Sequence, residues 1–173
     1  NTLFQLVQNK SDRSFNEYLY GKSSYKFSSV LYRRYPELKG RVSITEEKSI
    51  GSNIFEKLPE IFSDEKQSEQ QIGIYGRINN ERVTKWLDRD LVEWHPNLEK
   101  YKVFLPASNG NGDIGEVLSN PLVGHPFIGH TQTFISFGAF DTEQEAQNCL
   151  KYIKTDFARA MLGTLKVTQH NQS

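Results

Sequence analysis

Four basic side chains lie close together near the middle of the sequence, in and around a segment that alternates apolar and polar residues. They are Arg77, Arg82, Lys85 and Arg89. Arginine can donate two parallel hydrogen bonds to a guanine edge, and both arginine and lysine can neutralise a phosphate. These four residues are therefore candidates for contacts with the bases or the backbone of a nucleic acid. The alternative interpretation is an ordinary solvated surface.

A second group of candidates follows in residues 107–131, which are rich in glycine, proline and small polar residues. Ser108, Asn109 and Asn111 carry hydrogen-bond donors and acceptors that suit base edges, and so do Thr131, Gln132 and Thr133 at the end of this stretch and just after it. A loop of this length in a compact domain is usually functional or disordered. We therefore expect these side chains to contact the same ligand as the four basic residues.

Further basic residues flank these two groups. Lys151, Lys154 and Lys166 are candidates for phosphate contacts. Residues 18–35 interleave tyrosines with basic side chains, a pattern that allows stacking on bases and contact with phosphate. A half-exposed loop that covers the core explains this stretch equally well.

The motifs of familiar catalytic sites are absent or incomplete. Asn120-Pro121-Leu122 lacks the second proline and the aromatic residue of an adenine methyltransferase loop, and Asp64-Glu65-Lys66 has nuclease-like letters in a polar segment without a strand. His125 and His130 have no evident third partner for a metal ion. Cys149 falls on the apolar face of an expected helix and is interpreted as a small core residue. No catalytic residue and no metal site is predicted.

The elements that would position these side chains follow from hydrophobic periodicity. Strands are expected over 71–78, 82–87, 102–106 and 133–140, and a helix over 141–162. Asn79 and Asn80 predict a tight turn, and Thr142 with Glu145 predicts a capping box. The predicted fold class is α/β (α+β), a single domain over 1–173. It has a twisted mixed sheet of about four or more strands with packed helices.

The alternation also predicts which side chains share a face of the 71–87 hairpin. Arg82 is expected beside Thr84 and Trp86. If Tyr75 and Trp86 are core residues, Arg82 points inward too and is no longer a candidate.

Composition limits the class of protein. The 173 residues include 21 Lys and Arg and 21 Asp and Glu, so the net charge is zero, and no Lys or Arg lies between Lys102 and Lys151. Neutrality argues weakly against nonspecific nucleic-acid binding, which depends on phosphate neutralisation. No apolar run approaches the length of a membrane span, and one cysteine excludes a disulfide framework. The N-terminus lacks a basic and then apolar leader, so a cytoplasmic location without membrane contact is expected.

Several ordered blocks in residues 71–171 resemble a known family. The blocks are Tyr75-Gly76-Arg77, Arg82-Val83-Thr84-Lys85-Trp86, Lys102-Val103-Phe104-Leu105-Pro106, the run from Gly129 to Ala146, the run from Leu150 to Arg159, and Lys166-Val167-Thr168-Gln169. They are similar to the C-terminal region of bacterial restriction-modification N6-adenine DNA methyltransferases, of the type II, Taq-like kind. Residues 1–70 match that region only loosely.

The resemblance implies a target-recognition domain like the specificity domains of those enzymes. Such a domain reads a short sequence in double-stranded DNA and is not catalytic by itself. The resemblance places the S-adenosylmethionine site and the catalytic loop in a separate methyltransferase domain, so this chain is expected to be part of a longer protein and to hold no cofactor. Two alternatives stay open, a divergent restriction-type nuclease domain and a protein-interaction module of a restriction-modification complex.

Overall fold

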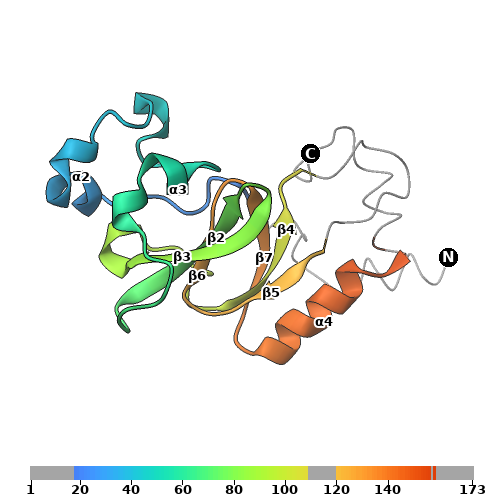
Figure 1. The fold of residues 1–173 in the computed structure, drawn as a ribbon. Coiled ribbons are helices and arrows are strands. Elements are labelled where there is room, and N and C mark those ends of the chain that lie inside the picture. The colour runs from blue at the N-terminus through green and yellow to red at the C-terminus, as the bar shows by residue number, and fades with distance from the viewer. Residues whose placement is uncertain (1–17, 109–119, 157, 159–173) are drawn as a thin grey trace.

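The computed structural model describes residues 18–108, 120–156 and 158, and Figure 1 shows how their elements are arranged. The strands are β1 (Leu19–Tyr20), β2 (Gln71–Ile78), β3 (Glu81–Asp88), β4 (Tyr101–Pro106), β5 (Leu122–Gly124), β6 (Ile128–His130) and β7 (Phe134–Phe140). The α-helices are α2 (Val30–Arg34), α3 (Ile54–Lys57) and α4 (Glu143–Ile153). Short 3-10 helices are η2 (Pro36–Leu38), η3 (Ile44–Glu46), η4 (Pro59–Ile61) and η5 (Arg89–Leu91).

The strands form two sheets. One has the order β1-β7-β4-β5 with antiparallel pairs, and the other has the order β3-β2-β6, in which β2 is antiparallel to β3 and parallel to β6. The mixed α/β fold expected from the sequence is confirmed, and the four expected strands are present as β2, β3, β4 and β7. They are divided two to a sheet, whereas the sequence predicted one sheet.

The β2–β3 hairpin follows directly from its sequence. Asn79 and Asn80 both have positive φ angles, 50° and 65°, as a two-residue hairpin turn of type I′ requires. Asparagine tolerates this conformation better than most residues. The turn fixes a register in which Arg77 lies directly opposite Arg82.

The segment 107–131 was expected to be a loop, and this prediction is wrong for β5 and β6. Each of these strands has three residues, which is too short to show an alternating pattern. β5 pairs with β4 in the larger sheet, and β6 pairs with β2 in the smaller one. The chain therefore crosses between the sheets over residues 125–127 and returns over 131–133.

One face of the smaller sheet is covered by the N-terminal part of the described chain. Residues from Tyr25 to Ile61 supply most of this core, and β2 and β3 contribute Ile72, Ile74 and Leu87. Figure 1 shows α2 and α3 on this side of the fold, away from α4. The N-terminal portion is therefore integral to the domain core.

The second core lies between the larger sheet and α4. Val103, Leu105 and Ile135 face Ile153 of the helix, and the half-buried Cys149 packs beside them, as its place on the apolar face predicted. The predicted capping box is confirmed, because Thr142 Oγ1 accepts a hydrogen bond from Glu145 N and Thr142 N donates to Glu145 Oε2.

The helix itself is shorter than expected. It ends at Ile153, whereas the sequence predicted a helix to residue 162. Asp156 and Ala158 are helical again, and residues 157 and 159–162 lie outside the described residues. Thr155 interrupts it, since its Oγ1 donates to the Tyr152 carbonyl at 2.7 Å and accepts from Ala158 N at 3.2 Å. This local side-chain bonding competes with the helical ladder.

Aromatic side chains fill the space between the two sheets. Tyr75 of β2 stacks on Phe104 of β4, with ring centroids 5.5 Å apart, and lies 4.6 Å from the ring of Phe134 in β7. The order of layers is therefore the N-terminal helices, the smaller sheet, the larger sheet and α4. Alternation along β4 and β7 places Phe104 and Phe134 on the face opposite the one that contacts α4.

Candidate nucleic-acid interface

A cleft of about 360 Å³ lies where β2 and β4 end and β7 begins. The lining residues whose side chains can donate or accept hydrogen bonds are Lys22, Ser52, Arg77, Ser108, Gln132 and Thr133. These residues come from five separate stretches of the chain and meet only because the two sheets pack against each other. Two cationic groups, three hydroxyls and one amide thus surround the opening.

Arg77 is the predicted site residue with the most unusual surroundings. Its guanidinium carbon lies 5.9 Å from the ring centre of Phe134, a cation–π contact. Its Nε is buried and has no hydrogen-bond partner, and no acidic side chain pairs with Arg77 among the described residues. A buried unpaired donor costs about 1–3 kcal/mol, and more when it is charged. Arg77 is therefore held in place at a cost to stability.

The sequence placed Arg77 beside Arg82, Lys85 and Arg89, but the structure does not gather the four residues at one site. Arg82 packs on the same aromatic ring as Arg77, with its guanidinium carbon 5.8 Å from the ring centre. Its Nη1 donates to the Asn120 carbonyl at 2.8 Å. Arg82 thus points into the layer between the sheets, as it must if Tyr75 is a core residue.

The other two members of the group have different surroundings. Lys85 lies on the opposite face of the hairpin, and its ammonium pairs with the exposed carboxylate of Asp64. Arg89 follows β3, and its Nη1 donates to the Val92 carbonyl at 2.8 Å. Because successive residues of a strand face opposite ways, a cluster in sequence does not become a cluster in space.

The structure places the other candidates as follows. Ser108 is exposed and lines the cleft beside Arg77. Lys151 and Lys154 are exposed at the end of α4, beyond the larger sheet, so they do not share the cleft. Asn109, Asn111 and Lys166 lie outside the described residues.

Lys22 and Ser52 line the cleft but were not among the predicted base contacts, whereas Gln132 and Thr133 were. Lys22 belongs to the tyrosine-rich and basic stretch 18–35, which was the only sequence signal for it. Ser52 lies just before α3, and Gln132 lies where the chain crosses between the sheets. Gln132 Nε2 donates to Ser23 Oγ at 3.2 Å, and this bond ties the segment that carries Lys22 to the cleft.

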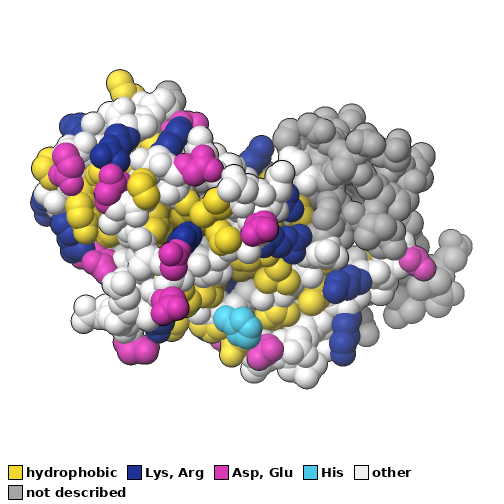
Figure 2. All heavy atoms as spheres, viewed as in Figure 1, with side chains coloured by type: hydrophobic (Ala, Val, Ile, Leu, Met, Phe, Trp, Pro, Cys, Tyr) yellow, Lys and Arg dark blue, Asp and Glu magenta, His cyan; other side chains and the backbone are white. Residues whose placement is uncertain are grey.

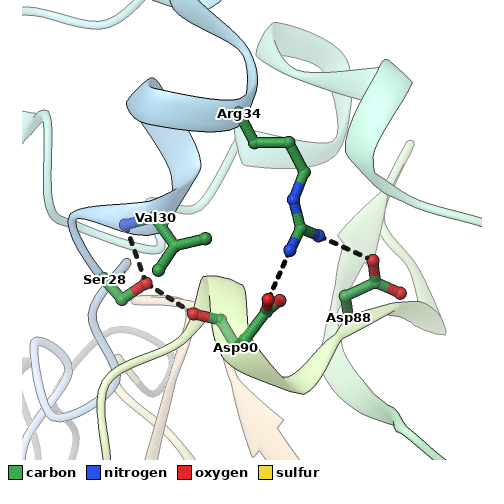
Figure 3. Close-up of polar contacts among 5 residues, drawn as sticks. All are labelled: Ser28, Val30, Arg34, Asp88 and Asp90. Atoms are coloured by element: carbon green, nitrogen blue, oxygen red, sulfur yellow. Dashed lines mark hydrogen bonds and ion pairs between the residues drawn. The ribbon is translucent and has the colours of Figure 1, made fainter.

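Arg34 shows how a basic residue elsewhere in the fold is neutralised. Its guanidinium bonds the carboxylates of Asp88 and Asp90, while Ser28 Oγ donates to the Asp90 carbonyl and accepts from Val30 N (Figure 3). On the face shown in Figure 2, basic and acidic side chains lie interspersed over the end of the molecule that holds α2 and α3. Arg77 has no such acidic partner in the described part of the chain.

A second polar cluster is completely buried and links the two sheets. Asn97 accepts from Tyr25 Oη at 2.6 Å and donates to Ser136 Oγ at 3.0 Å. His130 Nδ1 bonds the Thr131 carbonyl at 2.9 Å, so its Nε2 accepts from Ser136 Oγ at 3.1 Å. Burial lowers the pKa of His130 to about 3. The imidazole is therefore neutral and its nitrogens are occupied.

Lys102 lies next to this cluster, and none of the described acidic residues pairs with it. It is fully buried, and its Nζ donates to the carbonyls of Asn97 and Leu98 at 2.8 and 3.0 Å. Burial lowers the pKa of Lys102 from 10.5 to about 7. The amine thus holds the 97–98 turn against β4. Its two hydrogen bonds are to backbone, so we assign it a structural role.

The described residues contain neither a metal-binding cluster nor a membrane-spanning helix. They contain no group of three or more His, Cys, Asp or Glu side chains that is arranged to hold a metal ion. No helix in the described ranges is long and apolar enough to cross a bilayer. The cleft can therefore be characterised by its own donors, which suit an oxygen-rich anionic ligand.

Comparisons with known proteins add no information about the cleft. The chain matches no known family model, no curated protein and no solved structure.

Proposed function

We propose that this chain is a sequence-specific DNA recognition domain of a type II restriction-modification system, and part of an adenine-N6 DNA methyltransferase. In this proposal the chain binds duplex DNA and presents an adenine to a separate catalytic domain. That domain flips the base out of the helix and methylates it with S-adenosylmethionine. The described residues bind and position DNA, and the reaction occurs elsewhere.

The observation that carries the proposal is the cleft around Arg77. Arg77 has a buried Nε without a partner and no acidic partner among the described residues, and Lys22 lines the same opening, so an anionic ligand at the Nη end would supply the counter-charge that the two cations lack. DNA supplies such groups at every nucleotide. The ordered blocks in residues 71–171 add the resemblance to the methyltransferase family, and Arg77 lies inside one of those blocks.

A recognition domain of this kind needs a partner surface for the catalytic domain. Trp94 and Phe127 are large apolar residues with 69% and 49% of their surfaces exposed. Trp94 lies four residues before Leu98, and the Leu98 carbonyl accepts a hydrogen bond from Phe127 N at 2.7 Å. Phe127 also has a φ angle of 62°, which is unfavourable for a phenylalanine. We propose that the methyltransferase domain covers these side chains. A cytoplasmic location goes with the proposal, because bacterial DNA lies there.

The experiment is selection from a pool of randomised duplex DNA with this chain, at two salt concentrations, followed by sequencing. The proposal expects enrichment of a short motif, and weaker binding at the higher salt. Arg77→Ala should lower the recovery of DNA. Arg33→Ala removes the same charge from an exposed position on α2 and should leave the recovery unchanged.

Other results would contradict the proposal in distinct ways. Cleavage of the pool when Mg²⁺ is added would favour a nuclease domain. Absence of binding at low salt, both for this chain and for a longer protein that includes a methyltransferase domain, would rule out DNA recognition. A protein partner bound with little salt dependence would then favour an interaction module.

A further inference from the structure

The charge balance of the cleft distinguishes between two uses of Arg77. Lys22 and Arg77 both line the opening, and among the described residues no carboxylate lines it. A guanine edge is neutral, so it would leave two neighbouring cations without an anion. A phosphate carries the charge that both cations need, and its oxygens can accept from the hydroxyls of Ser52, Ser108 and Thr133.

The surroundings of Arg77 point the same way. Its guanidinium rests against Phe134, and the buried atom is Nε, so the side chain can offer only its Nη end to the cleft. Arg82 lies directly across the hairpin, and like charges in that position destabilise a strand pair. A bound anion would relieve this repulsion, whereas a neutral base edge would relieve it less.

Lys22 supplies the second cation from a tethered segment. The Ser23 hydroxyl accepts from Gln132, so residue 22 is held at the mouth of the cleft. Lysine acts as a point charge, and it binds phosphate without the fixed fork that base recognition uses. The pairing of one arginine with one lysine is therefore typical of a site for a phosphate group.

We infer that the cleft binds a phosphate of the nucleic-acid backbone, with Arg77 as its main ligand and Lys22 as its second. This inference rests on the proposed function, and it makes Arg77 a positioning residue that sets the register of the domain on DNA. Base discrimination then belongs to other side chains. A free phosphate monoester offers the same oxygens, so the test must separate the two sources.

The first part of the test uses inorganic phosphate and thermal unfolding of the intact chain. Phosphate should raise the Tm by about 2–4 °C at roughly five times its Kd, relative to potassium chloride of equal ionic strength. Arg77→Gln should lose this rise. Without phosphate, its Tm should be no lower than that of the unaltered protein, because the substitution removes an unpaired charge. Arg33→Gln removes an equal charge at an exposed position on α2 and should keep the phosphate response.

The second part measures binding to duplexes with and without the enriched motif over a range of salt. A backbone contact predicts that Arg77→Gln weakens both duplexes by the same factor. It should also reduce the slope of log K against log salt by about one. Deoxynucleoside monophosphates, tested in parallel, report binding of a free phosphate monoester.

The outcomes separate the two proposals. If Arg77→Gln relaxes discrimination at a single base pair and phosphate has no effect on the Tm, Arg77 contacts a base. The inference then fails while DNA recognition stands. If phosphate or a monophosphate binds through Arg77 but DNA does not bind, the phosphate site stands and the DNA backbone as its source is refuted. If neither binds, both proposals fail.

Discussion

Replacing Lys102 with methionine tests whether the buried amine is uncharged near neutral pH. In the folded chain, burial lowers the pKa of Lys102 to about 7, compared with 10.5 for an ordinary lysine. Between these two pH values the unfolded chain binds a proton that the folded chain does not. The folded state is therefore penalised at and below pH 7, and this penalty is removed as the pH rises toward 10.5.

The magnitude follows from the two pKa values. Each pH unit inside the window changes the free energy of unfolding by at most about 1.4 kcal/mol. At pH 7 the amine of the folded chain is half protonated, so Lys102 raises the free energy of unfolding by about 2 kcal/mol between pH 7 and pH 9. Lys102→Met removes this gain. It also leaves the carbonyls of Asn97 and Leu98 without their donor, at a cost of about 1–3 kcal/mol each that does not depend on pH.

Urea unfolding of the unaltered protein and the variant at pH 7, 8 and 9 measures the effect. The quantity of interest is the difference between the two proteins, because every other titrating group is shared and cancels. That difference should widen by about 2 kcal/mol from pH 7 to pH 9, in favour of the unaltered protein. Lys26→Met, at an exposed lysine, is the matched control and should show no widening.

Parallel stability curves for the unaltered protein and Lys102→Met would refute this reasoning. They would mean that the amine stays charged in the fold. If the variant is too unstable to measure, NMR titration of the Lys102 side chain in the unaltered protein decides the question. A midpoint near 10 would then contradict the expected pKa.

Three further changes test the fold. Burial lowers the pKa of His130 to about 3, so the free energy of unfolding should fall by up to about 1.4 kcal/mol per pH unit as the pH drops below 6.5. His130→Phe should flatten this pH dependence in thermal melts, and an unchanged slope would contradict the expected pKa. Gly76→Ala places a methyl group 2.5 Å from a ring carbon of Phe55 and should cost about 1–3 kcal/mol in urea unfolding, whereas a neutral result would mean that the ring moves aside. Thr142→Ala removes the cap that bonds Glu145 N and should cost about 1 kcal/mol in the same assay, and a cost near zero would show that the capping box does not stabilise α4.

Local patterns predicted the elements whose cause is local. The alternation around Asn79-Asn80 predicted the hairpin, and the Thr142–Glu145 pair predicted the start of α4. Both signals act within a few residues of chain. The end of α4 depended on one threonine hydroxyl, and helix periodicity does not register such a bond.

The pairing of distant strands left no such signal. β1 has two residues and pairs with β7, more than a hundred positions away, and β6 pairs in parallel with β2. Strands this short carry no periodicity, so the division into two sheets was not predictable. The site was predicted in part for the same reason. The candidates that line the cleft are Arg77, Ser108, Gln132 and Thr133, while Lys22 reaches it only through the packing of the two sheets.

The buried amide of Asn97 has a consequence for how the chain can be divided. Its partners Tyr25 and Ser136 lie 72 and 39 positions away, on either side of it in the sequence. A fragment that ends before Ser136, or begins after Tyr25, leaves the buried Asn97 amide without one of its partners. Folding of that fragment loses the hydrogen bond, while the cost of desolvating the amide remains. On the ribosome, the cluster can form only after Ser136 has been synthesised. The two sheets are thus expected to fold late and as one cooperative unit, and the smallest fragment that folds should span both partners.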